Sequence, residues 1–489
     1  MVAIRACGIV SYIAASRAKD LKNNMGDQSI RSFIHGLEQR GELVRFREPV
    51  DPLSNLTAIG WKTYDQLGKA SLFENLVGYP GWQVVNQIVC DRRKWGVALG
   101  VEEDEVVATL SERVGQQIDP VLVGQNNAPV KEVVLSDTDV DLTRIPAAWT
   151  SEHDPGPYIA SGMAVIRDPE TGLRNVSIHR QQVQGRDRTG FLICPRQAQR
   201  IYRKYQALGQ PMPVAVVVGA HPAIYFATAF TAPEGTDEFA VAGGLVGEPV
   251  RLVRCETIDL EVPAEAELVI EGEIPPNLEV PEGPFGEGSG GYGPAGVTQT
   301  LEVRAITRRA EPVFYALQCG APMTDAQSIV ATSGDMVLWR HLENVEGGLD
   351  LLDVRCLGIA GLMGVVIKLR PRVEGQAKTA LLAALSGPQM HPKLVIAVDE
   401  DIDANDMRQV FWSLTTRVHA ERDVIKIPKT RTWSLDNASD VIPGLDPMYR
   451  IGTKWLIDAT RPVSSTDRAR FERAMPLNHD IVELADFLP

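Results

Sequence analysis

The sequence predicts a multidomain fold that combines α/β and α+β regions, and three observations lead to this class. A chain of 489 residues is long enough for several domains of about 100–200 residues each. Its content of 44% hydrophobic and 23% charged residues is typical of a globular protein with substantial cores. The spacing of apolar residues also changes near Pro120 and again near Gln327. We therefore expect a mixed α/β region, an antiparallel β region and an alternating α/β region, in that order.

The first region mixes helices and strands up to about Val114. Its expected elements are a helix over Ser29–Arg40, a strand over Glu42–Phe46 and a helix over Leu56–Leu67. The first helix has apolar residues at helical spacing, with Asp27 as a possible cap and Gly41 as the stop. Residues 1–24 are expected to be a disordered extension, because a capped helix follows soon after Met25.

The middle region is predicted to form an antiparallel sheet or barrel. Strand-like runs over Tyr158–Ile166 and Arg174–Val183 are joined by the turn sequence Asp168–Gly172. Further strands are expected over Val214–Val218, Pro249–Arg254, Glu267–Ile270, Thr298–Ile306 and Val313–Leu317. A helical insertion is expected near Pro222–Leu245.

The last region alternates helices and strands, which is the pattern of α/β layers. Helices are expected over 327–345, 376–386 and 405–418, and strands near 351–357, 363–369 and 393–398. A further helix is expected over Arg468–Arg473.

Charge and cysteine content exclude several classes of protein. The 49 Lys and Arg residues against 63 Asp and Glu residues give a formal net charge of −14, so we expect no nucleic-acid partner. No apolar run reaches about 18 residues, so we expect no membrane-spanning helix. The six cysteines contain no C-x-x-C pair, which argues against a zinc ribbon and favours reduced thiols in a cytoplasmic protein.

A glycine-rich stretch carries two carboxylates, Glu282 and Glu287, on either side of Gly-Pro-Phe-Gly. In a regular strand this spacing would place them on opposite faces, but the Pro and Gly residues argue against a regular strand. The two acids can therefore converge, as paired carboxylates do in acid/base chemistry. The alternative is a solvated surface loop, which composition alone favours. A nucleotide-binding loop is excluded, because neither a helix start nor a P-loop Lys-Ser/Thr pair follows.

A second polar group lies on the strand that follows the Asp168–Gly172 turn. Asn175, His179 and Arg180 offer a metal ligand and a bidentate anion clamp. Convergence of Asn175 and Arg180 would need a bulge or a strong curl in the strand. The alternative is an ordinary polar face of an antiparallel sheet.

Two acidic stretches have two interpretations each. In Glu234–Glu238, Asp237 or Glu238 either binds a hard cation or begins a helix, where acids are favoured. The acids Asp399, Glu400, Asp401 and Asp403 follow a predicted strand. They either hold a cation or cap the next helix at Asn405, and we favour capping.

Taken together, these motifs resemble the UbiD family of decarboxylases. The resemblance rests on Asn175–Arg180 (Asn-Val-Ser-Ile-His-Arg), Glu238 and Glu282–Glu287 (Glu-Gly-Pro-Phe-Gly-Glu), supported by Arg167–Gly172 and Leu394–Thr416. It extends from about Met25 to Thr460. The family architecture implies an N-terminal α/β domain over 25–118, a central split β-barrel of the flavin-reductase-like kind over 119–320 and a C-terminal α/β oligomerisation domain over 321–489.

The resemblance also implies a reaction and its cofactors. Members of the family use prenylated FMN, made by a partner flavin prenyltransferase, together with a divalent cation (Mn2+ or Mg2+) and K+. They release CO2 reversibly from aromatic, heteroaromatic or α,β-unsaturated acids, and the modified flavin accepts the electrons that the lost carboxylate leaves behind. A homodimer or a hexamer is expected.

Individual roles follow from matching positions in the family motifs. Arg180 would hold the substrate carboxylate, Glu282 would orient Arg180, and Glu287 would act as the acid/base. The resemblance places these residues at the cofactor: Asn175, Ser177, Ile178, His179, Arg180, Ile193, Arg196, Gln197, Glu238 and Lys393. Lys393 and Arg417 would contact the cofactor phosphate.

The expected metal set, Asn175, Gln197 and Glu238, departs from the family pattern at one position. Gln197 stands where a His usually completes the set. A Gln carbonyl can bind a hard cation, although imidazole is the better ligand for manganese. The cation could be magnesium-like, weakly held or met by another group, and a one-residue slip in the match is an open alternative.

Two other functions compete with the decarboxylase interpretation. A catalytically silent paralogue or assembly subunit is supported by the Gln197 departure alone. A metal-dependent hydrolase or glycosidase that uses Glu282 and Glu287 would need metal ligands or a sugar platform that the sequence does not display. The exact acid stays open, with a heteroaromatic or hydroxylated aromatic acid preferred over a cinnamic acid.

Overall fold

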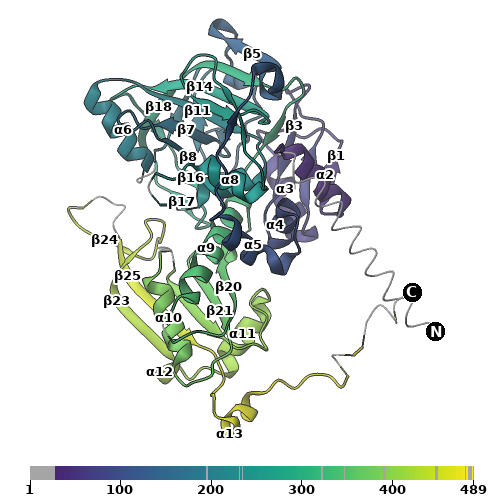
Figure 1. Cartoon of the computed structure of the whole chain (residues 1–489), viewed down its shortest axis with the longest axis vertical. Coiled ribbons are helices and arrows are strands. Elements are labelled where there is room, and N and C mark those ends of the chain that lie inside the picture. The colour runs from purple at the N-terminus through teal and green to yellow at the C-terminus, as the bar shows by residue number, and fades with distance from the viewer. Residues whose placement is uncertain are drawn as a thin grey trace. The chain divides into compact units, whose positions relative to one another are not determined.

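The computed structural model describes residues 28–193, 197–230, 232–233, 235–320, 323–345, 347–388, 392–445 and 450–478, with 481, 482 and 487 (Figure 1). The predicted extension over 1–24 lies outside the described residues, as do Asp27, Arg196 and Glu234.

The chain forms two compact units. The first contains the residues up to Val337 together with Cys356–Met363 and Ser434–Ala438. The second contains Leu338–Arg355, Gly364–Trp433 and the residues from Ser439 onward. The predicted division into three domains stays a prediction beside this two-unit arrangement.

A small mixed sheet with four helices begins the first unit (Figure 1). Its elements are α2 (Ile30–Gln39), β1 (Leu43–Phe46), α3 (Leu56–Leu67), β2 (Ala70–Phe73), β3 (Gln83–Asn86), α4 (Arg92–Leu99) and α5 (Val106–Arg113). Ser29 caps α2, because its hydroxyl oxygen accepts from the Ser32 backbone N–H in the first turn, where an α-helix supplies no backbone acceptor of its own. The strand β19 (Val313–Tyr315) completes the sheet by pairing in parallel with β3.

The middle of the chain forms a ten-stranded sheet whose described pairs are all antiparallel, which confirms the predicted antiparallel region. Its strands are β5 (Val133–Ser136), β6 (Tyr158–Ile159), β7 (Met163–Arg167), β8 (Arg174–Ile178), β9 (Gln181–Val183), β10 (Arg188–Phe191), β11 (Met212–Val218), β14 (Leu268–Ile274), β15 (Glu279–Glu282) and β18 (Gly296–Arg308). The turn over Asp168–Gly172 forms as expected, with Gly172 at φ +72°. Residues 179 and 180 lie between β8 and β9 and take no part in either strand. The polar run from Asn175 to Arg180 therefore begins in β8 and ends in the connection that follows it.

Short strands and three helices surround this sheet. They are β4 (Val121–Leu122), β12 (Arg251–Arg254), β13 (Glu261–Pro263), β16 (Phe285–Gly286), β17 (Tyr292–Gly293), α6 (Gln197–Leu208), α7 (Pro222–Ala229) and α8 (Glu238–Val246). The predicted helical insertion is therefore two helices. Every residue of α8 is buried, which explains its continuous apolar sequence.

The second unit alternates strands and helices as predicted. Helix α9 (Asp325–Glu343) leads into it, followed by β20 (Leu351–Leu357), β21 (Gly364–Leu369), α10 (Gln376–Ser386), β22 (Leu394–Val398), α11 (Met407–Thr416), α12 (Ala420–Asp423), β23 (Val424–Thr432), β24 (Asp440–Val441), β25 (Arg450–Asp458) and α13 (Ser465–Arg468). Strand β22 pairs in parallel with β21 and β25, and α10 packs over all three. The expected helix over Arg468–Arg473 forms only in part, as the end of α13 and one 3₁₀ turn.

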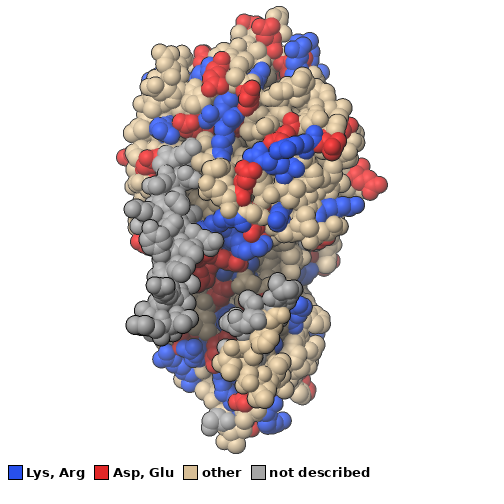
Figure 2. Space-filling model, turned by 90° about the vertical axis from the view of Figure 1, so that its right-hand side faces the viewer, with Lys and Arg blue, Asp and Glu red and all other residues tan. Residues whose placement is uncertain are grey.

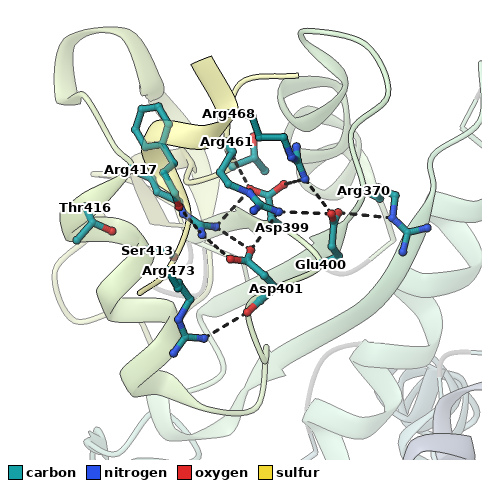
Figure 3. A network of polar contacts seen from close by, with 12 residues as sticks. Arg370, Asp399, Glu400, Asp401, Ser413, Thr416, Arg417, Arg461, Arg468 and Arg473 are labelled. Atoms are coloured by element: carbon teal, nitrogen blue, oxygen red, sulfur yellow. Dashed lines mark hydrogen bonds and ion pairs between the residues drawn. The ribbon is translucent and has the colours of Figure 1, made fainter. Parts of the chain in front are cut away.

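The acids that follow β22 form an ion-pair network, and this corrects both interpretations of them (Figure 3). Asp399 and Asp401 pair with Arg417, while Glu400 pairs with Arg468 at 2.8 Å. The cap of α11 is Asp406, which lies beyond the acidic stretch. The partners are arginines from distant parts of the chain, so the acids neither cap this helix nor form a group that could hold a metal ion.

Two surface properties agree with the composition. Among the described residues, no helix has the length and hydropathy needed to cross a lipid bilayer. On the face shown in Figure 2, basic and acidic side chains are interspersed rather than gathered by sign.

Candidate functional site

Arg180 and the two acids of the glycine-rich stretch form the first polar cluster. The Arg180 guanidinium donates from Nε and Nη2 to Glu282, at 2.9 and 2.8 Å, and from Nη1 to Glu287. The side chains of Arg180 and Glu282 are only 11% and 4% exposed. The two acids therefore converge on Arg180, as the family resemblance implies, and the solvated-loop interpretation that composition favoured is wrong because both carboxylates lie against a buried cation.

Aromatic side chains enclose this cluster. The Phe285 ring lies 4.7 Å from the Arg180 Cζ, and Tyr158 lies 4.6 Å from Phe285 between ring centroids. The Tyr158 hydroxyl donates to Glu282 at 2.9 Å. Burial raises the pKa of Tyr158, as does the neighbouring Glu282 charge, so the phenol keeps its proton and acts as a donor. Glu282 therefore accepts three hydrogen bonds, two from Arg180 and one from Tyr158.

Glu287 is the least constrained member of the cluster. Its side chain is 21% exposed and makes one ion pair, with Nη1 of Arg180. Burial raises the pKa of Glu287 and the adjacent Arg180 charge opposes that rise. A carboxyl group with a raised pKa and one exchangeable cation partner is suited to moving a proton.

The backbone around Glu287 leaves no room for side chains. A Cβ on Gly293 would lie 2.9 Å from Glu287 Oε1, and a Cβ on Gly286 would lie 2.3 Å from Ser151 Oγ. The glycines of this stretch thus allow close packing around the carboxylate rather than loop mobility.

Asp154 is a third buried carboxyl group that the sequence patterns missed. It is 3% exposed and accepts from the Gly286 N–H at 3.0 Å and the Ser151 N–H at 2.9 Å. Burial raises the pKa of Asp154 to about 6, against the opposing effect of these hydrogen bonds. No spacing signal links it to Glu282, because it acts on the glycine-rich stretch through a backbone N–H 132 residues away.

Asn175, Gln197 and Glu238 form a second cluster, which brings the predicted metal set together. The Asn175 Nδ2 donates to Gln197 Oε1 at 3.0 Å and to Glu238 Oε1 at 3.2 Å. Glu238 is the first residue of α8, its other oxygen accepts the Val176 N–H at 3.0 Å, and Asp237 caps the helix. Both interpretations of this acidic stretch thus have structural support, since one acid caps α8 and its neighbour joins the cluster.

The chemistry of this cluster fits a hard cation. One carboxylate and two amides supply oxygen ligands that Mg2+ or Mn2+ accepts, and Asn175 would turn its amide so that Oδ1 rather than Nδ2 faces Gln197 and Glu238. Burial disfavours the charged form of Glu238 and raises its pKa to about 7. A bound cation would stabilise that negative charge. Among the described residues, no three His, Cys, Asp or Glu side chains are placed to hold a metal ion, so any such site depends on the two amides.

Ser177 and His179 continue the same face of the strand. Ser177 Oγ lies 2.8 Å from His179 Nε2, and His179 Nδ1 lies 2.9 Å from the Leu192 carbonyl oxygen. The carbonyl can only accept, so Nδ1 carries the proton and Nε2 accepts from Ser177. Burial lowers the pKa of His179 to about 4, so the ring is neutral at pH 7. Asn175 and Arg180 thus belong to different clusters on one polar run.

The remaining predicted residues differ in what can be said of them. Ile178 ends β8 and is half-buried, and Ile193 is 7% exposed beside the uncharacterised stretch that contains Arg196. Lys393 precedes β22 in the second unit, where its carbonyl accepts the Trp455 N–H. Arg417 is fully buried among Asp399 and Asp401, a structural pairing that differs from the predicted phosphate contact.

Family comparisons cover almost the whole described chain. Residues 34–114, 121–322 and 327–459 match the N-terminal, Rift-related and C-terminal domains of 3-octaprenyl-4-hydroxybenzoate carboxy-lyase. A phenolic acid decarboxylase from Sedimentibacter hydroxybenzoicus is 32% identical over 454 residues, which cover 89% of this chain and 92% of that protein.

Solved structures agree with this assignment. The UbiD-class enzyme HmfF from Pelotomaculum thermopropionicum, in complex with FMN, has a TM-score of 0.86 at 34% identity, covering 94% of this chain and 100% of that one. The 3,4-dihydroxybenzoic acid decarboxylase AroY from Klebsiella pneumoniae has a TM-score of 0.86 at 28% identity, covering 94% and 99%. An evolved dimeric form of HmfF, in complex with prenylated FMN, has a TM-score of 0.83 at 33% identity, covering 94% and 100%. With three matching domains, a shared fold and the converging Arg180–Glu282–Glu287 cluster, this chain belongs to the UbiD family and is a carboxy-lyase.

Proposed function

We propose that this enzyme reversibly decarboxylates an aromatic or heteroaromatic acid with prenylated FMN, that Arg180 binds the substrate carboxylate and that Glu287 is the acid/base. The proposal rests on the position of the Arg180 guanidinium between two carboxylates. Glu282 accepts two hydrogen bonds from Arg180, whereas Glu287 accepts one and is more exposed. The flavin complex of HmfF supports the cofactor. The ten-stranded sheet would be the split barrel that holds it, with Asn175, Gln197 and Glu238 binding a divalent cation and K+ nearby.

The arrangement of donors on Arg180 suggests how the carboxylate binds. Glu282 takes the edge of the guanidinium formed by Nε and Nη2. The remaining edge, formed by Nη1 and Nη2, fits a second carboxylate in the same two-point manner, but Glu287 holds its Nη1 end. A substrate acid would therefore take the place of Glu287 on Arg180.

This exchange would prepare Glu287 for its role. In the free enzyme Arg180 opposes the rise in the pKa of Glu287 that burial causes, and a substrate carboxylate on Arg180 would weaken this opposition and add a like charge. Glu287 would then take up a proton beside the substrate. Bound prenylated FMN supplies the electron acceptor for the carbon that loses CO2, and Glu287 delivers the proton to that carbon.

The alternative is a catalytically silent paralogue, for which Gln197 is the only support. The amide still lies in the cluster with Asn175 and Glu238, which favours a working cofactor site. The proposal also includes an aromatic acid as the substrate, a flavin prenyltransferase as the supplier of the cofactor, and assembly as a homodimer or hexamer.

The test is co-expression with a flavin prenyltransferase, followed by mass spectrometry of the released small molecules and a screen of aromatic acids for CO2. We expect prenylated FMN in the wild type and in Glu287→Gln, with CO2 from the wild type alone. Glu279→Gln, at an exposed acid that begins strand β15 just before the glycine-rich stretch, is the matched control and should keep full turnover. Absence of any flavin in the wild type would favour the silent paralogue.

A further inference from the structure

The residues on either side of Glu287 are each held by a buried side chain from a distant element. Asp154 accepts from the Gly286 N–H at 3.0 Å. Gln327, in the first turn of α9, donates from Nε2 to the Gly288 carbonyl oxygen at 3.0 Å. The backbone is thus fixed immediately before and immediately after the carboxylate-bearing residue.

Both the nitrogen and the oxygen of the Gln327 side-chain amide form hydrogen bonds. The residue is fully buried, and Nε2 donates to the Gly320 carbonyl oxygen at 3.0 Å as well as to Gly288. Its Oε1 accepts from the Thr324 N–H at 3.0 Å and the Thr324 hydroxyl at 3.3 Å. The oxygen therefore caps α9 in the manner of a capping box, and both amide hydrogens reach outside the helix.

Asp154 is committed in the same way. Its two oxygens accept from Gly286 and Ser151, and the Ser151 hydroxyl lies where a Cβ on Gly286 would be. His153, which directly precedes Asp154 in the turn, donates its N–H to the Tyr292 hydroxyl at 3.3 Å. The turn over residues 151–154 thus packs against both ends of the glycine-rich stretch.

The stretch itself has little regular structure to hold Glu287. The β16–β17 pair is two residues long, and the Glu287 N–H and carbonyl bond within the stretch, to Gly291 and Gly290. With so many glycines the backbone has wide conformational freedom unless outside groups restrict it. Two buried polar side chains, each with one hydrogen bond to this backbone and its other hydrogen bonds to neighbouring elements, provide that restriction.

We propose that Asp154 and Gln327 are positioning residues that clamp the backbone of Glu287 and so place its carboxyl group for proton transfer. The inference rests on the proposed acid/base role of Glu287. A displacement of about 1 Å at a reacting group costs on the order of 100-fold in rate, which sets the expected effect. Loss of either clamp residue should lower kcat about 10- to 100-fold and leave KM within about twofold, because Arg180 and Glu282 keep their contacts.

The experiment compares two substitutions at Gln327 that separate the clamp from the helix cap. Gln327→Glu keeps the oxygen that caps α9 but loses the two N–H donors, whereas Gln327→Met loses both functions. If the residue only stabilises α9, Glu restores kcat. If it clamps Glu287, both variants lose kcat. Gln376→Met removes a glutamine that accepts backbone N–H groups at the start of α10 and is the matched control.

Hydrogen exchange supplies a readout that does not depend on turnover. Backbone amides of residues 283–292 should exchange faster in Gln327→Glu and in Asp154→Ala, which removes the acceptor for the Gly286 N–H, with the wild-type rate in Gln376→Met and in the rest of each variant. Unchanged exchange in this segment, or unchanged kcat in both clamp variants, overturns the inference. If exchange is faster in the variants but the wild type decarboxylates no acid, the proposed function is overturned. The two side chains would then restrict the backbone of Glu287 without a role in proton transfer. If Gln327→Glu does not fold, Asp154→Ala decides the outcome by the same two measurements.

Discussion

Replacing Glu287 with Gln is predicted to tighten substrate binding even though it abolishes turnover. In the free enzyme Glu287 occupies the Nη1 end of Arg180, and the substrate carboxylate must displace it. The neutral amide of Gln competes less well for that position than a carboxylate does. The substrate carboxylate should therefore displace the side chain at position 287 from Arg180 more easily in the variant.

The size of the effect follows from the strength of the contact. A hydrogen bond to a charged group contributes about 1.5–3 kcal/mol, and a neutral one roughly half as much. The difference of about 1 kcal/mol corresponds to a dissociation constant roughly fivefold lower. The low exposure of the pair, 11% for Arg180 and 21% for Glu287, limits screening by water.

The assay is calorimetric titration of an aromatic acid into enzyme loaded with FMN in place of its prenylated form, so that neither protein turns over. Glu279→Gln provides the control, because it removes one exposed acid from strand β15, close in sequence to Glu287, and that acid makes no contact with Arg180. A dissociation constant that is unchanged or higher in Glu287→Gln would refute the competition between Glu287 and substrate.

Three further outcomes follow from the same geometry. Arg180→Lys should raise KM about 10-fold or more in steady-state assays, since Lys lacks the two-point edge, while Arg186→Lys, at a 63% exposed side chain, should not. The pKa of Asp154, raised to about 6 by burial, means its carboxyl stabilises the fold less as pH rises from 4 to 6. Denaturant titrations should thus show the wild type losing about 2 kcal/mol relative to Asp154→Ala across that window, and a constant difference would contradict the pKa. Gln197→His should bind Mn2+ about tenfold more tightly by EPR titration, and equal affinity would argue against Gln197 as a ligand.

Much of the fold was predictable because local signals and packing agree. The helix over Leu56–Leu67 and the strand over Leu351–Leu357 form with the predicted bounds. Apolar periodicity marks these elements, and Gly68 ends the helix in the left-handed conformation. The expected start of α9 was two residues late, because Thr324 and Gln327 form a cap that apolar spacing does not show.

The site was predictable where residues act through their side chains within one motif. Glu282 and Glu287 converge because the Gly-Pro-Phe-Gly kink turns the chain between them. Asp154 could not be found in this way, since its partner is a backbone N–H. The acids at 399–401 were misinterpreted for a related reason: their arginine partners lie up to 69 residues away, and sequence order alone does not reveal such pairs.

The central claim is that Glu287 delivers the proton to the carbon that loses CO2, and a decarboxylation in D2O tests it most directly. Wild type and Glu287→Gln, both loaded with prenylated FMN, would be mixed with a substrate acid, and the product would be analysed by mass spectrometry. We predict that the wild type forms product with one deuterium at the former carboxyl carbon, and that Glu287→Gln releases no product. Release of deuterated product from Glu287→Gln at the wild-type rate would show that another group delivers the proton.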